Sequence, residues 1–247
     1  MTPLNEDETR EGHADAMLFE QPYSALVIGA SGAIGAAFFD AFQKDPWCQH
    51  VHGVSRGQGL GFDLSSEPSI IASATHCRSW APFQVIVDAT GALSIDGVGP
   101  EKSLSALDPV QLHKLFQINA IGPALVLKHF SSLLAPGLGI YAKLSARVGS
   151  ISDNKKGGWY GYRASKAALN MVLQTAALEL QRKNPELRIV ALQPGTVSSN
   201  LSKPFTAGMP TLLTPQASVA GLLLTMKSLR SKAGAHFVDY KGQDIAW

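Results

Sequence analysis

A tyrosine and a lysine four residues apart, Tyr162 and Lys166, are the side chains of this sequence best suited to proton transfer. Positions i and i+4 of a helix lie on the same face. An ammonium beside a phenol favours the phenolate and lowers the tyrosine pKa from about 10, so that the tyrosine exchanges protons at neutral pH. The same spacing also occurs by chance at a helix start with a solvated lysine, so the pair needs support from other motifs.

A glycine-rich turn near the N-terminus offers a place for a phosphate. Residues 25–28 are wholly apolar, which is typical of a buried parallel strand, and Gly29, Gly32 and Gly35 follow directly. An apolar helix pattern then runs over residues 36–42. Glycines let a phosphate approach the backbone, and the helix N-terminus offers free N–H groups to a pyrophosphate. The pattern therefore predicts a dinucleotide site, with a turn needed only for packing as the alternative.

The next strand, predicted over residues 51–54, ends at Ser55 and Arg56. In a dinucleotide-binding fold this point meets the adenosine ribose, where an acidic residue suits NAD and an arginine suits the 2′-phosphate of NADP. Arg56 therefore favours NADP(H), and NAD(H) is the alternative. Residues 62–64 resemble the end of a third strand, in which Asp63 either faces the adenine or forms a turn.

Strand and helix patterns alternate along the rest of the chain. Further strands are predicted over residues 84–88, 139–145, 187–192 and 235–239, and helices over 67–77, 109–130, 160–182 and 214–229. This alternation predicts an α/β fold, a single-domain, Rossmann-like, doubly wound parallel sheet with helices on both faces. Asn119 lies in the apolar run of its helix, and a buried asparagine needs partners, so it is either a site residue or a satisfied core amide.

Domain organisation and location follow from composition. The 247 residues, 45% of them hydrophobic, suit one domain over residues 23–247, preceded by a flexible leader at 1–22. The loop 198–213 is predicted to be a mobile lid or substrate loop. A net charge of +2 favours neither nucleic acid nor a membrane surface as partner. The two cysteines, the lack of Cys/His metal spacing and the lack of an apolar signal segment predict a metal-free cytoplasmic protein.

Taken together, these motifs resemble the short-chain dehydrogenase/reductase family over about residues 23–245. The motifs that carry the resemblance are Gly29 to Gly35, Asp63-Leu64, Asp88-Ala89-Thr90-Gly91, Asn119, Ser145, Tyr162-x-x-x-Lys166 and Pro194-Gly195-Thr196-Val197. The run over residues 144–151 and the C-terminal Trp247 look most like the C-factor and sniffer-type carbonyl reductase subgroup.

The resemblance implies a catalytic set of four residues. Tyr162 would give its proton to a carbonyl oxygen as hydride arrives from the nicotinamide, and Lys166 would bind the nicotinamide ribose and lower the tyrosine pKa. Ser145 would donate a hydrogen bond to the substrate oxygen, and Asn119 would hold a water that links Lys166 to solvent. The implied cofactor-binding residues are Gly29, Ser31, Gly32, Ala33, Ile34, Gly35, Ser55, Arg56, Asp63, Leu64, Ala89, Thr90, Gly91, Asn119, Tyr162, Lys166, Pro194, Gly195, Thr196 and Val197.

The chain departs from the family pattern at four places. One of them is Gly32, where many NADP enzymes of the family have a basic residue, so that Arg56 alone carries the preference for NADP(H). Ala33 stands at the usual middle glycine and adds a methyl near the pyrophosphate. The usual Asn-Asn-Ala-Gly is replaced by the run from Asp88 to Gly91. The usual serine, counted back along Ser-x-x-Gly, falls on Ala146, and one residue along a strand reverses the direction of a side chain. Both Ser145 and Ser150 therefore remain candidates for the serine that meets the substrate oxygen.

These observations predict an NADP(H)-dependent oxidoreductase that reduces an aldehyde, ketone or quinone to an alcohol. The alternative of a different class is a dinucleotide-binding signalling or sensor protein with little turnover, because a fold does not fix a function. A purely structural subunit is a third hypothesis, which the intact Asn, Tyr and Lys set disfavours. The family resemblance also implies a homodimer or homotetramer.

Overall fold

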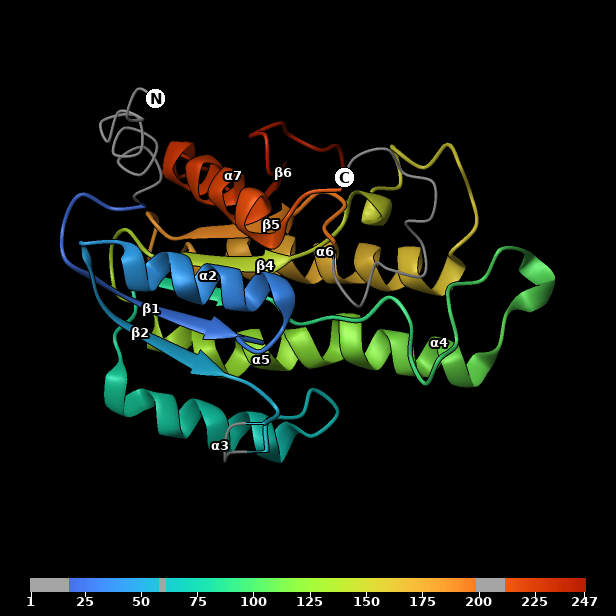
Figure 1. Cartoon of the computed structure of the whole chain (residues 1–247), viewed down its shortest axis with the longest axis horizontal. Coiled ribbons are helices and arrows are strands. Elements are labelled where there is room, and N and C mark those ends of the chain that lie inside the picture. The colour runs from blue at the N-terminus through green and yellow to red at the C-terminus, as the bar shows by residue number, and fades with distance from the viewer. Residues whose placement is uncertain (1–17, 58–60, 199–211) are drawn as a thin grey trace, which may run out of the picture.

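Six parallel strands form one sheet at the centre of the computed structural model, which describes residues 18–57, 61–198 and 212–247 (Figure 1). The strand order is β2-β1-β3-β4-β5-β6, and each neighbouring pair is parallel. The strands are β1 (Tyr23–Ile28), β2 (Cys48–Val54), β3 (Val85–Asp88), β4 (Ile140–Leu144), β5 (Arg188–Gln193) and β6 (His236–Asp239). The order reverses beside β1, and this switch point is where open α/β sheets bind ligands at the carboxyl ends of their strands.

Helices cover both faces of this sheet. They are α2 (Ala33–Lys44), α3 (Glu67–Cys77), α4 (Pro109–Phe116), α5 (Gly122–Phe130), α6 (Tyr160–Leu180) and α7 (Pro215–Ser228). Apolar side chains of α2 and α7 pack with one face of the sheet, and those of α3, α5 and α6 pack with the other (Figure 1). The central strands are buried on both faces, which explains their nearly continuous apolar sequences.

The predicted helix over residues 109–130 is interrupted at the candidate site residue Asn119. A π-helical segment, Gln117–Ile121, joins α4 to α5. Such segments insert one residue into the helical turn and are frequent at functional sites. Here the segment turns the buried Asn119 side chain toward the carboxyl end of β3.

The predicted strand over residues 62–64 is wrong. Phe62 and Leu64 are buried, but the backbone of this segment bonds to side chains rather than to a strand. The Asp63 N–H donates to Ser69 Oγ at 2.9 Å, and Gln117 Nε2 donates to the carbonyl of Leu64 at 3.1 Å. The segment is therefore held by side chains of α3 and of the π-helical segment between α4 and α5.

The two predicted flexible segments fall largely outside the described residues. The lid predicted over 198–213 includes residues 199–211, which the structure does not describe. Most of the predicted leader, residues 1–17, is likewise outside the described residues. Leu18 and Phe19 are described and are buried in the α2–α7 core, where the Phe19 ring lies 5.0 Å from that of Tyr23. These two residues of the predicted leader therefore contribute to the packed core. In the described part of the chain, no helix has the length and apolarity needed to cross a membrane.

Candidate active site

Two adjoining cavities lie along the carboxyl ends of the strands. The first, of about 520 Å³, contains Ser55, Arg56 and Asp63 in its wall, and the second, of about 430 Å³, contains Tyr162 and Lys166. The residues that line both are Ser31, Gly32, Arg56, Ala89, Thr90, Gly91 and Ala92. A ligand that spans them would reach from the end of β2 to α6, across the switch point of the sheet.

The glycine turn after β1 separates the cavities from the core. Gly29 has a φ of +85°, which favours glycine. A Cβ on Gly35 would lie 2.1 Å from the carbonyl oxygen of Gly29, so α2 approaches this turn as closely as backbone allows. The first turn of α2 has no side-chain cap, and its N–H groups are at the wall formed by Gly32, Ala33 and Ile34. This helix start is therefore suited to an anion.

The end of β2 carries the groups predicted to read the adenosine ribose. Ser55 is buried, and the exposed Arg56 lines both cavities. Asp63 lies in the wall of the first cavity, but its Oδ1 accepts hydrogen bonds from the N–H of Ser65 at 2.8 Å and from its Oγ at 2.7 Å. These bonds, with a smaller contribution from Arg56, lower the pKa of Asp63. Asp63 is therefore a turn-forming residue that also faces the cavity.

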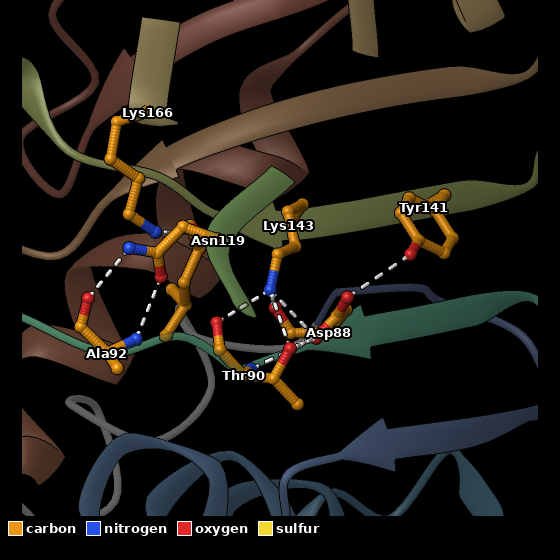
Figure 2. Close-up of polar contacts among 8 residues, drawn as sticks. Asp88, Thr90, Ala92, Asn119, Tyr141, Lys143 and Lys166 are labelled. Atoms are coloured by element: carbon orange, nitrogen blue, oxygen red, sulfur yellow. Dashed lines mark hydrogen bonds and ion pairs between the residues drawn. The ribbon is translucent and has the colours of Figure 1, made fainter. Parts of the chain in front are cut away.

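A turn after β3 forms the floor shared by both cavities. Asn119 binds this turn at Ala92, because its Oδ1 accepts from the Ala92 N–H and its Nδ2 donates to the Ala92 carbonyl, both at 2.8 Å (Figure 2). Its Nδ2 also donates to Ser165 Oγ at 3.2 Å. Asn119 is therefore a satisfied core amide that shapes the cavity floor, and it lines neither cavity itself.

Tyr162 and Lys166 lie on one face of α6 and both line the second cavity. Lys166 Nζ lies 5.8 Å from the centroid of the Tyr162 ring and donates to the carbonyl of Leu144 at 3.2 Å. Burial lowers the pKa of Lys166 to about 7, helped by the nearby ammonium of Lys143 and opposed by Asp88. Burial also raises the pKa of Tyr162 to about 12. The predicted lowering of the tyrosine pKa is thus wrong for this structure, because desolvation of the phenolate outweighs its lysine neighbour.

Ser145 lines the second cavity, and Ser150 does not. The Ser145 hydroxyl donates to Asn170 Oδ1 at 2.6 Å, while Asn170 Nδ2 donates to the carbonyl of Gly149 at 3.4 Å. Ser150 Oγ accepts from the N–H of Asp153 at 3.0 Å. Of the two candidates, Ser145 is nearer the reacting groups, although its proton is directed to Asn170.

The start of α6 is held by Glu101, a residue that the sequence patterns did not single out. Trp159, just before the helix, has a φ of +55° and donates its N–H to the carbonyl of Glu101 at 2.5 Å. The buried Glu101 carboxylate accepts from the N–H of Gly161 at 3.0 Å. A carboxylate at a helix N-terminus satisfies a free donor and interacts favourably with the helix dipole. Glu101 therefore fixes the first turn of the helix that carries Tyr162.

Most of the predicted cofactor residues line the two cavities, but four do not. These four are Asn119, Gly195, Thr196 and Val197. Gly195 and Val197 pack instead near Leu213, which pairs with Val197. Lining residues that the motifs did not include are Phe62, Ala92, Ser94, Ile95, Asp96, Ile118 and Leu144. Most of them lie close in sequence to a predicted motif, so extending each motif by a few residues would have included them.

The sequence pattern described as short chain dehydrogenase matches residues 24–210 of this chain, which covers the glycine turn, Asn119, Tyr162 and Lys166. The chain belongs to the short-chain dehydrogenase family. The predicted resemblance to that family is therefore confirmed, and the doubly wound fold agrees with it.

Two curated relatives of this short-chain dehydrogenase are informative. It is 29% identical over 188 residues to 1-hydroxy-2-glutathionyl-2-methyl-3-butene dehydrogenase of Rhodococcus sp. (strain AD45), an alignment that covers 76% of this chain and 79% of the relative. It is 34% identical over 151 residues to C-signal of Myxococcus xanthus, covering 59% of this chain and 84% of that protein. The second similarity confirms the predicted likeness to the C-factor subgroup.

Solved structures agree with this assignment. A short-chain dehydrogenase/reductase from Burkholderia multivorans with bound NADP matches with a TM-score of 0.77 and 26% identity, over 92% of this chain and all of the other. The carbonyl reductase Sniffer of D. melanogaster matches with a TM-score of 0.78 over the same shares, at 22% identity, and shows a shared fold.

Proposed function

We propose that this short-chain dehydrogenase binds NADP(H) and reduces the carbonyl group of a small molecule to an alcohol, with Tyr162 as the proton donor. The observation that carries the proposal is the pair of adjoining cavities, which places Arg56 in one wall and Tyr162 with Lys166 in another. The bound NADP in the Burkholderia multivorans relative supports the choice of cofactor.

The residues present fit such a dinucleotide. The uncapped start of α2 would take the pyrophosphate, and Arg56 with Ser55 would take the 2′-phosphate of the adenosine ribose. Lys166 would donate to the hydroxyls of the nicotinamide ribose. The methyl of Ala33 lies in the wall of the second cavity, where the family has a glycine. Bound NADPH would supply the hydride.

The chain's own contribution to the reaction is a positioned proton. Because burial raises the pKa of Tyr162 to about 12, the phenol stays protonated at neutral pH and is ready to donate to a carbonyl oxygen. With hydride supplied by the bound cofactor, Tyr162 would give its proton to the carbonyl oxygen, and the phenolate left behind would regain a proton from solvent. Ser145 would hold the substrate oxygen when its hydroxyl turns from Asn170 toward the cavity.

A pH dependence follows from Lys166. Its pKa of about 7 means that the ammonium is present at lower pH and is lost as the pH rises through neutrality. The catalytic efficiency for NADPH, which reports on the free enzyme, should therefore fall above about pH 7. A pH profile of kcat/KM checks this, and a profile that stays flat from weakly acidic to weakly basic pH would contradict the role of Lys166.

The proposal is tested by measuring NADPH and NADH affinity first and then screening carbonyl compounds with the tighter cofactor. NADPH consumption with aldehydes, ketones or quinones is the expected result, and apolar compounds head the screen because of the apolar residues predicted in the 198–213 loop. NADPH binding without consumption across these three classes would favour the second candidate below.

The second candidate is a dinucleotide-binding signalling or sensor protein with little turnover. It is favoured by the bond between Ser145 and Asn170 and by Ala146, which stands at the family's serine position. The same screen separates the two functions.

We also propose that the protein self-associates, as a homodimer or homotetramer in the cytoplasm. Helix α6 packs beside α4 and the π-helical segment, and large apolar side chains are exposed along these neighbouring elements. They are Val110, Ile121, Met171 and Leu178, with exposed fractions of 57%, 48%, 67% and 47%. Exposed apolar side chains that gather on neighbouring elements are typical of an interface.

A further inference from the structure

A second lysine is buried at the end of the central strands, close to the candidate site. Lys143 of β4 lies opposite Asp88 of β3 in the sheet register, and both side chains are fully buried. Lys143 Nζ donates to Asp88 Oδ1 at 2.9 Å, to Thr90 Oγ1 at 2.9 Å and to the Thr90 carbonyl at 2.6 Å (Figure 2). All three N–H groups of an ammonium are thereby satisfied, which allows the charge to remain in the interior.

The carboxylate of this pair holds the same turn from within. Asp88 Oδ1 accepts from the N–H of Thr90 at 3.0 Å and from its Oγ1 at 2.5 Å, and the Tyr141 hydroxyl lies 3.5 Å from Asp88 Oδ2. Burying two charges costs about as much free energy as their attraction returns, so replacing both partners of a buried ion pair is often tolerated. Removing one partner is destabilising, because it leaves an unpaired charge in the interior. The presence of two opposite charges here therefore invites a functional explanation.

The turn that the pair holds touches the reacting lysine. Lys143 fixes its start at Thr90, and Asn119 fixes its end at Ala92, as Figure 2 shows. Between them, Gly91 has a φ of +143°, and a Cβ added there would lie 3.3 Å from both Lys166 Nζ and Asn119 Oδ1. The position of the turn therefore decides how much room the Lys166 ammonium has.

The pair also acts on Lys166 through charge. The titratable or charged groups that face Lys166 are Tyr162 of its own helix, Lys143 of β4 and Asp88 of β3. The Lys143 ammonium disfavours a second positive charge nearby and lowers the pKa of Lys166, whereas the Asp88 carboxylate acts in the opposite direction. While both are charged, their effects partly cancel.

We propose that Asp88 and Lys143 are a positioning pair for Lys166, which holds the turn from Thr90 to Ala92 against it and sets the electric field at its ammonium. Asp88 stands at the first position of the run, Asp88 to Gly91, that replaces the family's Asn-Asn-Ala-Gly. The inference rests on the proposed function only in taking Lys166 as a site residue.

The test follows the ionisation of Lys166 directly, by NMR titration of the full chain labelled with ¹³C-lysine, with the Lys166 signal assigned from Lys166→Arg. Lys143→Met removes the cation and should move the titration midpoint of Lys166 up by about 1 pH unit, and Asp88→Asn should move it down by a similar amount. The double variant should return close to the wild type. Lys128→Met, which removes a lysine from a surface ion pair with Glu67, should leave it unchanged.

A midpoint in Lys143→Met that lies above the midpoint in Asp88→Asn supports the proposal, and a midpoint at or below it overturns the proposal. If thermal unfolding shows that either variant fails to fold, Lys143→Gln and Asp88→Ser repeat the comparison with smaller disturbance. This readout needs neither cofactor nor turnover. Failure of the proposed function would appear separately, as a wild-type protein that consumes no NADPH.

NADPH affinity, measured by fluorescence titration, tests whether Asp88 and Lys143 fix the position of the turn from Thr90 to Ala92. The double variant Asp88→Asn/Lys143→Met, in which the charges are gone together, should bind NADPH about tenfold more weakly than the wild type at the same pH, because the two hydrogen bonds from Lys143 to Thr90 are lost. Wild-type affinity in the folded double variant would overturn that part of the proposal.

Discussion

Tyr162 and Lys166 share one face of α6, and burial moves their pKa values apart, to about 12 for the tyrosine and about 7 for the lysine. In each case desolvation disfavours the charged form, which is the phenolate of Tyr162 and the ammonium of Lys166. The phenol is therefore kept as an acid, which suits the reduction of a carbonyl group. At neutral pH the lysine is divided between its two forms, so small changes in nearby charge alter its state.

The roles of single residues were only partly predictable from sequence. The spacing of Tyr162 and Lys166 placed both in one cavity, because a helix face follows directly from i and i+4. The ion pair between Asp88 and Lys143 was missed, because it depends on the register of β3 and β4, in which the two residues are 55 positions apart along the chain. The direction of the Tyr162 pKa shift was wrong, because spacing does not reveal burial.

A prediction at this scale concerns cofactor choice. Arg56→Ala should weaken NADPH binding by about 10-fold to 100-fold, the value of one or two charge-assisted hydrogen bonds, and should leave NADH binding nearly unchanged. Fluorescence titrations with both cofactors provide the measurement. Equal losses for the two cofactors would mean that Arg56 supports the fold of the cavity and does not read the 2′-phosphate.

The elements position these side chains by close backbone contact at the ends of strands. The glycine turn after β1 and the turn after β3 lie against each other, since a Cβ on Gly29 would lie 3.2 Å from the backbone of Ala89. The predicted elements agree with the structure wherever an apolar run was long. The short run over residues 62–64 was mistaken for a strand, because its burial comes from helices packed above it.

Gly35 offers a test of the approach between α2 and the turn. Gly35→Ala should displace the start of α2, because its Cβ would lie 2.1 Å from the Gly29 carbonyl oxygen. We expect a destabilisation of roughly 1–3 kcal/mol and a loss of NADPH affinity. Gly57→Ala is the matched control, since its Cβ would meet no atom of the described residues within 4 Å. Thermal unfolding and NADPH titration measure both effects, and a Gly35→Ala protein that matches the control would refute the close approach.

At the scale of the whole molecule, one parallel sheet gathers residues from the entire chain. Its switch point beside β1 brings the end of β2, the turn after β3 and the start of α6 to one edge, where the two cavities lie. The alternation of strands and helices predicted this arrangement, because parallel strands with crossover helices leave few topologies. The predicted substrate loop over residues 198–213 falls mostly on residues 199–211, which lie outside the described residues.

The exposed apolar side chains on α4, the π-helical segment and α6 lead to a prediction about assembly. Light scattering should give a mass of at least twice the 26.2 kDa of one chain. Met171→Glu, which puts a charge among these side chains, should shift the protein toward the monomer without lowering its unfolding temperature, because the side chain is 67% exposed. A monomeric wild type would contradict this expectation.

The most direct test of the account compares two tyrosines two residues apart, Tyr162 in the second cavity and Tyr160 exposed at the helix start. With a carbonyl substrate found in the screen, Tyr162→Phe should lower the rate of NADPH consumption by about 100-fold to 10,000-fold and leave NADPH affinity nearly intact, because only the proton donor is removed. Tyr160→Phe should retain the wild-type rate. A Tyr162→Phe protein that consumes NADPH at the wild-type rate would contradict the assignment of Tyr162 as the acid.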